Sequence, residues 1–193
     1  MGRRLHALSW LLGMAAALST PVVCPGAAWG QNQAPALTGR ALWIGLFVGG
    51  SEWRDDDFRG RDSPIVLGIL GDDPLFKKEI EPLRTWTFQK RKVEVRECGS
   101  VEEATACHVV FICSSEKRRL ASTLKPLRGH RILTISDAEG FFNEGGIASV
   151  TLKQTGLNTF TVVPDVNQRI LSHGEWKFNS DLFRLLEKSQ KVK

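Results

Sequence analysis

The chain has 193 residues, a length that fits one domain with at most a small appendage. Hydrophobic residues make up 42% of it and charged residues 24%, which excludes a disordered tail protein, a collagen-like repeat and a polytopic membrane protein. Without Arg3 and Arg4 the chain keeps 24 basic and 21 acidic residues, a net charge of +3, so its basic balance does not indicate a nucleic-acid partner.

The first thirty residues have the pattern of a secretory signal peptide. Arg3 and Arg4 precede an apolar run over Ala7–Leu18, and Ala28 and Gly30 supply the small residues of a cleavage site. The 12-residue run is shorter than the roughly 20 residues that span a bilayer, which argues against a membrane anchor. We therefore expect residues 1–30 to be removed and the mature protein to be exported and not itself transmembrane.

Cleavage after Gly30 is expected because both small-residue positions are filled. Intact-mass analysis of the exported protein should find a chain without residues 1–30. A mass that still includes Met1 to Leu18 would contradict export by this route. Beyond the cleavage site, residues 31–40 are expected to be a flexible mature N-terminus, and residues 41–190 a single α/β domain.

The first predicted element of the mature domain is the apolar run Ala41–Val48, which fits either a helix or a buried strand. Thr38 is a plausible N-cap if the run is helical. A charged loop over Glu52–Asp62 follows, with Trp53 and Phe58 embedded in it.

Strands and helices then alternate. The strands are expected at Ile65–Leu70, Val93–Arg96, Val109–Cys113 and Ile132–Ile135. The helices are expected to begin at Pro74 after an Asp72 or Asp73 cap, after Ser100 with Glu103 completing a capping box, and over Glu116–Leu127. This alternation predicts a mostly parallel sheet covered by helices on both faces.

The pattern changes near the C-terminus. Ile147–Leu152 and Phe160–Val163 are separated by a short polar turn, which predicts an antiparallel hairpin. A terminal helix is expected to start near Asn179 or Ser180. The predicted fold class is therefore α/β, with a mostly parallel sheet, an antiparallel C-terminal hairpin and a terminal helix.

Cys98, Cys107 and Cys113 remain once the signal peptide is removed, and an odd number implies a free thiol or an intermolecular bond. Their spacing fits no zinc template, so we expect no metal and no cofactor. Cys98–Cys107 is the favoured intrachain bond because it would bridge a short helix. Three free thiols and a covalent dimer stay open as alternatives.

No catalytic residues are expected. His108 begins its predicted strand, whereas Ser114 and Ser115 follow its end, so a hydrolytic triad would be too widely separated. Asp72 and Asp73 follow a strand, as the acids of a phosphoacceptor domain do, but the acceptor Asp expected after the third strand is missing.

Two loops and one acidic residue are the binding candidates. The loop Asp137–Gly146 contains Phe141, Phe142, Gly145 and Gly146, and it fits either an anchored turn or a recognition loop. Trp53 and Phe58 fit either a lid over the core or an interface, and Asp72 lies at the ligand-favoured edge of the sheet. We interpret the aromatics of both loops as exposed. If a partner docks there, Trp53→Ala or Phe142→Ala should release the activity of that partner and leave the fold intact, whereas His108→Ala should act through stability.

The order of several motifs resembles the YfiR family of exported bacterial proteins. The matching segments are Ile69–Pro74, Cys107–Ile112, Ile132–Asp137, Gly140–Phe141 with Gly145–Gly146, Val166–Asn167 and Ser180–Leu182. The resemblance runs from about Leu42 to Leu186, and it favours a helix for Ala41–Val48. Gly68 stands where some relatives carry a cysteine that bridges to the equivalent of Cys107, so their disulfide scheme does not transfer.

The resemblance implies a non-enzymatic periplasmic signalling protein. Studied relatives restrain an inner-membrane diguanylate cyclase through its periplasmic sensor domain, which lowers cyclic di-GMP and biofilm formation. The alternative is a periplasmic small-ligand-binding module that serves a receptor or sensor kinase. A homodimer remains open, and no nucleic-acid partner is expected.

Overall fold

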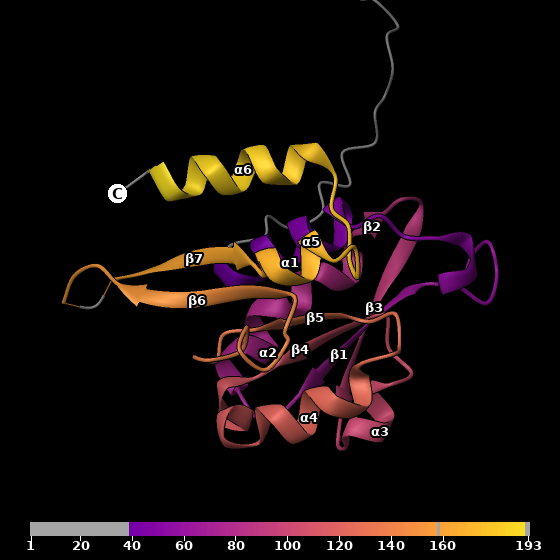
Figure 1. Ribbon diagram of the computed structural model, residues 1–193, viewed down its shortest axis with the longest axis horizontal. Coiled ribbons are helices and arrows are strands. Elements are labelled where there is room, and N and C mark those ends of the chain that lie inside the picture. Colours follow the sequence, from indigo (N-terminus) through magenta and orange to yellow (C-terminus); the bar gives the residue numbers. More distant parts are fainter. Residues whose placement is uncertain (1–38, 158, 192–193) are drawn as a thin grey trace, which may run out of the picture. The chain divides into compact units, whose positions relative to one another are not determined.

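The computed structural model describes residues 39–157 and 159–191. Within them lies a seven-stranded sheet in the order β2-β3-β1-β4-β5-β6-β7 (Figure 1). Its strands are β1 (Ile65–Leu70), β2 (Thr87–Phe88), β3 (Arg91–Cys98), β4 (Val109–Ile112), β5 (Leu133–Ser136), β6 (Ala148–Gln154) and β7 (Phe160–Val166). The predicted signal peptide, its cleavage site and Thr38 lie outside the described residues.

The sheet is mostly parallel, as predicted. β1 lies between β3 and β4 and is parallel to both, and β5 and β6 continue the parallel part. β6 then pairs antiparallel with β7 over its whole length, which confirms the C-terminal hairpin. At the other edge, β2 pairs antiparallel with β3 through only two residues, and the sequence did not predict this strand.

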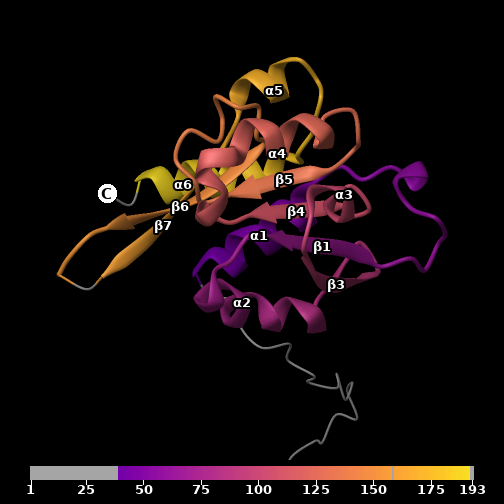
Figure 2. The same ribbon diagram turned by 90° about the horizontal axis from the view of Figure 1, so that it is seen from below.

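Helices cover both faces of the sheet. They are α1 (Gly39–Gly50), α2 (Pro74–Ile80), α3 (Val101–Ala104), α4 (Leu120–Leu127), α5 (Gln168–Ser172) and α6 (Ser180–Lys191), with 3-10 turns η1 (Asp55–Asp57), η2 (Glu81–Thr85) and η3 (Ser114–Arg119). Side chains of α1, α2 and α6 join one buried cluster, and those of α3 and α4 join another. Figure 2 shows α2 and α4 on opposite sides of the sheet.

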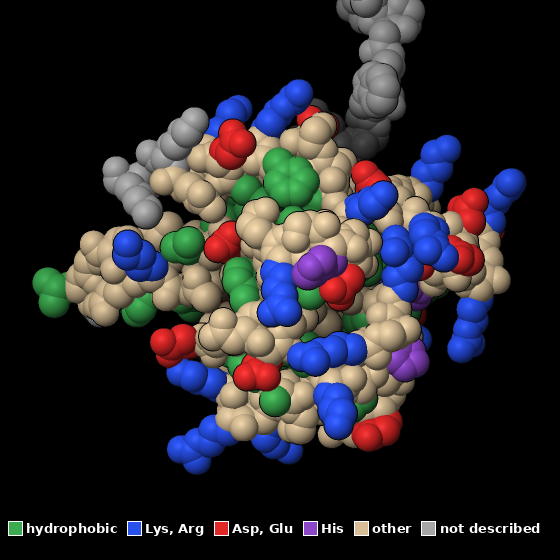
Figure 3. Space-filling view, viewed as in Figure 1, with side chains coloured by type: hydrophobic (Ala, Val, Ile, Leu, Met, Phe, Trp, Pro, Cys, Tyr) green, Lys and Arg blue, Asp and Glu red, His purple; other side chains and the backbone are tan. Residues whose placement is uncertain are grey.

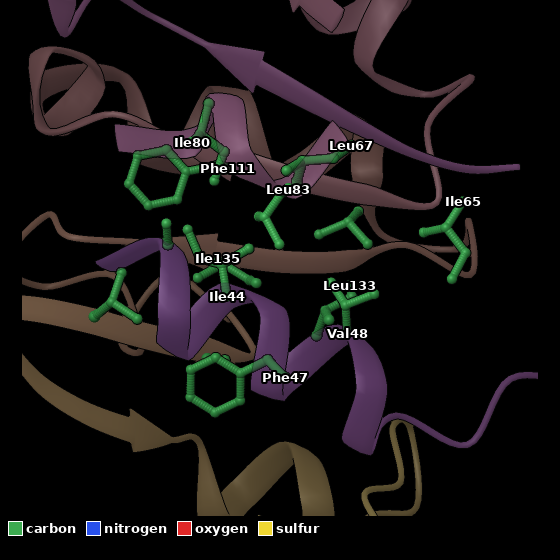
Figure 4. Close-up of a cluster of buried hydrophobic side chains, with 14 of the residues drawn as sticks. Ile44, Phe47, Val48, Ile65, Leu67, Ile80, Leu83, Phe111, Leu133 and Ile135 are labelled. Carbon is green, nitrogen blue, oxygen red and sulfur yellow. The ribbon is translucent and has the colours of Figure 1, made fainter. Parts of the chain in front are cut away.

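The two buried clusters alternate along the strands. In β1, Ile65, Leu67 and Ile69 belong to the cluster of α1, α2 and α6, whereas Val66 and Leu70 belong to the cluster of α3 and α4. A strand covered on both faces is apolar at nearly every position, which explains the continuous apolar run in the sequence. Figure 4 shows the first cluster, in which side chains of α1 lie against those of β5.

Residues 41–48 are helical, which resolves the ambiguity of that run. The helix starts earlier than predicted, because Gly39 and Arg40 form its first turn. The prediction that the flexible N-terminus extends to residue 40 is therefore wrong at its end. Arg40 is only 5% exposed, and ion pairs with acidic side chains hold it in place.

Helix caps were predicted more accurately than helix lengths. Asp73 caps α2 by accepting a hydrogen bond from the Phe76 backbone, and Ser100 caps α3 in the same way. The single helix predicted over Glu116–Leu127 is wrong in its first four residues, which belong to the 3-10 turn η3, and α-helical geometry begins only at Leu120. Gly129 follows the helix with a φ of +88°, the conformation expected of a terminating glycine.

The β6–β7 hairpin extends beyond the helices that cover its base (Figure 1). Its base is buried at Ala148, Val150 and Val166, whereas Leu152 and Phe160 farther along are exposed. β7 is an edge strand, and Pro164 within it has no backbone N–H. Part of this edge therefore cannot donate a hydrogen bond to a further strand.

Candidate functional site

The loop between α1 and β1 places two aromatic candidates beside the amino ends of the parallel strands. Trp53 is half-buried, and its indole Nε1 donates a hydrogen bond to the Val48 carbonyl at 2.9 Å. Phe58 is only 9% exposed. The expectation that this pair forms an exposed aromatic surface is therefore wrong, because both rings pack inward on residues distant in the sequence.

The rings belong to an aromatic cluster that we define as Trp53, Phe58, His108 and Trp176. The Trp53 centroid lies 5.9 Å from that of Phe58 and 5.4 Å from that of Trp176. Phe58 stacks on the His108 imidazole at 4.8 Å. Offset and edge-to-face contacts at these separations stabilise aromatic packing beyond its buried area. The cluster thus fixes the loop against the start of β4.

Two arginines cover the aromatic cluster. The Arg91 guanidinium lies 3.7 Å from the Phe58 ring centroid, and that of Arg131 lies 5.1 Å from the Trp176 ring. Arg131 also pairs with Asp57 at 2.7 Å and donates to the Glu52 carbonyl at 2.8 Å. Arg131 therefore ties the loop to the start of β5.

His108 is a structural member of this cluster. Its Nδ1 accepts a hydrogen bond from the Val66 backbone at 3.0 Å, and the Asp57 backbone is a further hydrogen-bond partner. Burial lowers the pKa of the imidazole below its ordinary value, so the ring is neutral at neutral pH. Because Nδ1 already accepts a hydrogen bond from a backbone amide, it is not available to accept a proton. The neutral ring therefore serves to position the strand.

Two cavities flank Arg131, with volumes of about 540 and 370 Å³. Both are lined by His130, Arg131 and Ile132, and we call the two together the Arg131 groove. Arg59, Arg96, Asp56 and Glu94 line the first, and Arg128, Gly145, Glu175 and Trp176 line the second. Arginines and acids occur in similar numbers, so the groove has no strong preference for one charge.

The rim of the groove carries mixed charge. Arg96 pairs with Glu94 at 2.7 Å on β3, and Arg54 pairs with Asp56 in the loop between α1 and β1. In Figure 3, the loop that projects on the right of Figure 1 shows basic and acidic side chains side by side. This mixture is typical of a polar protein-binding rim and unlike an anion-binding pocket.

The loop after β5 is an anchored turn. Phe141 is 2% exposed and packs in the cluster of α3 and α4, which agrees with the anchored-turn interpretation and makes the interpretation of Phe141 as an exposed aromatic wrong. A Cβ on Gly146 would lie 2.1 Å from the Phe141 ring, so only glycine fits there. The Asn167 amide donates to the Phe142 and Gly146 carbonyls, which fixes the loop further. Phe142 is half-buried, and Gly145 lines the groove.

Asp72 lies elsewhere. It follows β1 at the carboxyl end of the sheet, whereas the groove lies at the amino ends of β1, β4 and β5. Its carboxylate is exposed and lies 3.4 Å from Lys77. The fold therefore places the Trp53 loop at the larger cavity of the groove and Gly145 at the smaller one. Asp72 lies at the opposite end of the sheet.

A buried ion cluster at the carboxyl end was not predicted from the sequence. The Arg40 guanidinium contacts Asp73 and Asp137 at 2.7 Å each and Glu79 at 3.1 Å. Burial raises the pKa of Asp137, and its Oδ1 has no hydrogen-bond partner within the described chain. For Asp73, burial also raises the pKa, but the Phe76 backbone and Arg40 outweigh this effect and lower it. The deeper burial of Asp137 explains why two carboxylates on one arginine shift in opposite directions.

Cys98, Cys107 and Cys113 are buried, and no disulfide joins them in this structure. Burial raises the pKa of the Cys113 thiol to about 12, so it is not a thiolate at neutral pH. In residues 39–157 and 159–191, His, Cys, Asp and Glu form no group that could hold a metal ion. No helix in the described part of the chain is long and apolar enough to cross a membrane.

Comparison with known proteins gives one family. A family model described as YfiR/HmsC-like matches residues 40–186, a range that includes the aromatic cluster, the groove and the Arg40 ion cluster. A search of curated proteins gives no match.

Proposed function

The chain belongs to the YfiR/HmsC-like family, and from this premise we propose that it is a non-enzymatic periplasmic regulator. It binds and restrains the periplasmic sensor domain of an inner-membrane partner, and the partner we propose is a diguanylate cyclase. Loss of this restraint raises cyclic di-GMP and biofilm formation. The family match over residues 40–186 is the observation that carries the proposal.

The Arg131 groove and its rim form the docking face in this proposal. The aromatic cluster and the Asp57–Arg131 pair hold the rim in place before a partner arrives. A preorganised surface loses little conformational entropy on binding, which favours affinity. Arginine is enriched at protein interfaces, and Arg59, Arg96 and Arg128 line the groove together with acidic residues.

Deletion of the gene tests the regulatory role. In the native host, deletion should raise cellular cyclic di-GMP, and the intact gene should restore it. Crosslinking in the periplasm followed by purification should recover an inner-membrane cyclase. Unchanged cyclic di-GMP together with recovery of a receptor or sensor kinase would favour the alternative, a binding module that serves such a partner.

Arg59→Glu tests the docking face. Arg59 is exposed and lines the larger cavity, so its charge reversal should disturb a partner without disturbing the core. Central interface arginines typically contribute about 2 kcal/mol or more, so we expect an affinity loss of roughly thirtyfold and cyclic di-GMP close to the deletion level.

Lys188→Glu is the matched control, because it makes the same charge change at an exposed position on α6. It should behave like the wild type, and both variants should keep the wild-type melting temperature. If Lys188→Glu releases the cyclase and Arg59→Glu does not, the docking face lies elsewhere.

A further inference from the structure

Gly68 leaves a space on the face of β1 that points toward α3 and α4. Its neighbours on that face, Val66 and Leu70, carry large side chains that pack in the cluster of α3 and α4. A Cβ at Gly68 would lie 2.7 Å from the sulfur of Cys107 and 2.8 Å from that of Cys98. The space left by the missing side chain is therefore where these two sulfur atoms meet.

Cys98 ends β3, which pairs with β1, and Cys107 lies between α3 and β4, where its Cβ would be 3.4 Å from a Cβ on Gly68. Their sulfur atoms lie 3.8 Å apart although the residues are nine positions apart in the chain. Both are buried, at 8% and 5% exposure. Because a disulfide S–S bond is about 2.05 Å long, the two sulfur atoms must approach each other by less than about 2 Å for the bond to form.

We propose that Cys98 and Cys107 form an intrachain disulfide when the chain folds in an oxidising compartment, and that Cys113 stays a free thiol. Cys113 packs in the opposite cluster, with α1 and α2, so the sheet separates it from the pair. Two of the three cysteines therefore form one disulfide, and the third stays a buried thiol.

The oxidant is a disulfide, either of a thiol–disulfide oxidoreductase or of a small molecule. One cysteine thiolate attacks the oxidant disulfide and releases one oxidant thiolate, giving a mixed disulfide. The second cysteine, as its thiolate, displaces the remaining oxidant thiol. Two electrons pass to the oxidant, whose two sulfurs take up the two protons that the cysteines lost. Because both sulfurs are buried in the folded chain, we place this step before α3 closes over them.

The bond would fasten one wall of the Arg131 groove. Thr105, Ala106 and Cys107 line the larger cavity, and the bond would join this segment to the end of β3. Closing a loop of this size is expected to raise the melting temperature by roughly 5–10 °C. The stability of this wall of the docking face would then depend on whether Cys98 and Cys107 are oxidised or reduced.

Two preparations test the pairing independently of the proposed location. In the first, protein from the native periplasm is alkylated without reductant and mapped by mass spectrometry. In the second, the reduced chain is purified from a cytoplasmic expression host and exposed to oxidised glutathione during refolding. Each should contain a linked Cys98–Cys107 peptide and a free Cys113, and reduction should lower the melting temperature.

Cys98→Ser and Cys113→Ser separate the pair from the third cysteine. Cys98→Ser should lose the redox-dependent melting shift, whereas Cys113→Ser should keep it. Free Cys98 and Cys107 after oxidative refolding, a bond to Cys113 or a covalent dimer would overturn the pairing, and peptide mapping of the wild type decides this even if a variant fails to fold. If refolding forms the pair but native protein keeps both thiols, the periplasmic location in the proposed function fails and the pairing stands.

Discussion

Replacing Arg40 by methionine is expected to lower the free energy of unfolding by roughly 3–5 kcal/mol. The guanidinium is buried and contacts three carboxylates, on Asp73, Glu79 and Asp137. Without it, Asp137 would remain a buried charge with no compensating cation among the described residues, and α1 would lose its side-chain ion pairs to α2 and to the end of β5. Urea unfolding followed by circular dichroism at neutral pH measures the loss.

The matched control is Arg184→Met, which removes an exposed arginine from its pair with Asp181 on α6. An exposed pair contributes at most about 1 kcal/mol, so this variant should stay close to the wild type. If both variants lowered the free energy of unfolding equally, the buried ion pairs of Arg40 would contribute no more than an exposed pair, which would contradict this prediction.

The loss caused by Arg40→Met should depend on pH in a defined direction. The pKa of Asp137 is already raised in the fold, so its contribution to stability is greatest below the ordinary value of 3.8 and is lost as pH rises through the raised value. Asp73 has a lowered pKa, so its contribution is present above 3.8 and is lost as pH falls through the lowered value. Removal of Arg40 raises the pKa of both, so the variant should approach the wild type as acid protonates the carboxylates. A deficit that grows on acidification would contradict this account.

The parallel sheet was predictable because its strands are buried on both faces and therefore form continuous apolar runs. β1 has the same bounds in the prediction and in the structure, and Asp73 caps α2 as expected. Local signals were sufficient for these elements because their determinants lie within a few residues of one another.

The missed elements lack such local signals. β2 has two residues, and its turn to β3 places Gln89 and Lys90 at positive φ, where asparagine or glycine is usual. Arg40 contacts carboxylates that are 33, 39 and 97 positions away, so its role depends on the tertiary fold. An arginine at the start of an otherwise apolar helix was the available signal, because a charge seldom adjoins a buried face without a partner.

The candidate site was only partly predictable for the same reason. The charged loop after α1 was recognised, but the burial of its aromatics depends on Trp176 near the other end of the chain. Trp176 packs on Trp53, and its Nε1 donates to the Ser51 hydroxyl at 3.2 Å across 125 positions. A half-buried aromatic in a charged loop fits an interface and a lid equally well until its distant neighbour is known.

Trp53→Ala is expected to lower the free energy of unfolding by about 3 kcal/mol, so the expectation that this variant leaves the fold intact no longer holds. The change removes contacts with Phe58 and Trp176 and the hydrogen bond to Val48. The value is at the lower end of the range for large aromatics because Trp53 is half-buried and not fully buried. Chemical unfolding and partner release should be measured on the same preparation.

Trp53→Phe and Phe142→Ala separate packing from recognition. Trp53→Phe keeps a ring in the aromatic cluster and loses the hydrogen bond to Val48, so it should recover most of the stability. Phe142 lies in the loop after β5 and is half-buried, so its truncation should cost less than that of Trp53. If Trp53→Ala releases the partner and Trp53→Phe restores both stability and restraint, Trp53 acts by holding the rim of the groove. A stable Trp53→Ala protein that no longer binds the partner would instead make Trp53 a direct contact, because only a contact with the partner explains lost binding in an undisturbed fold.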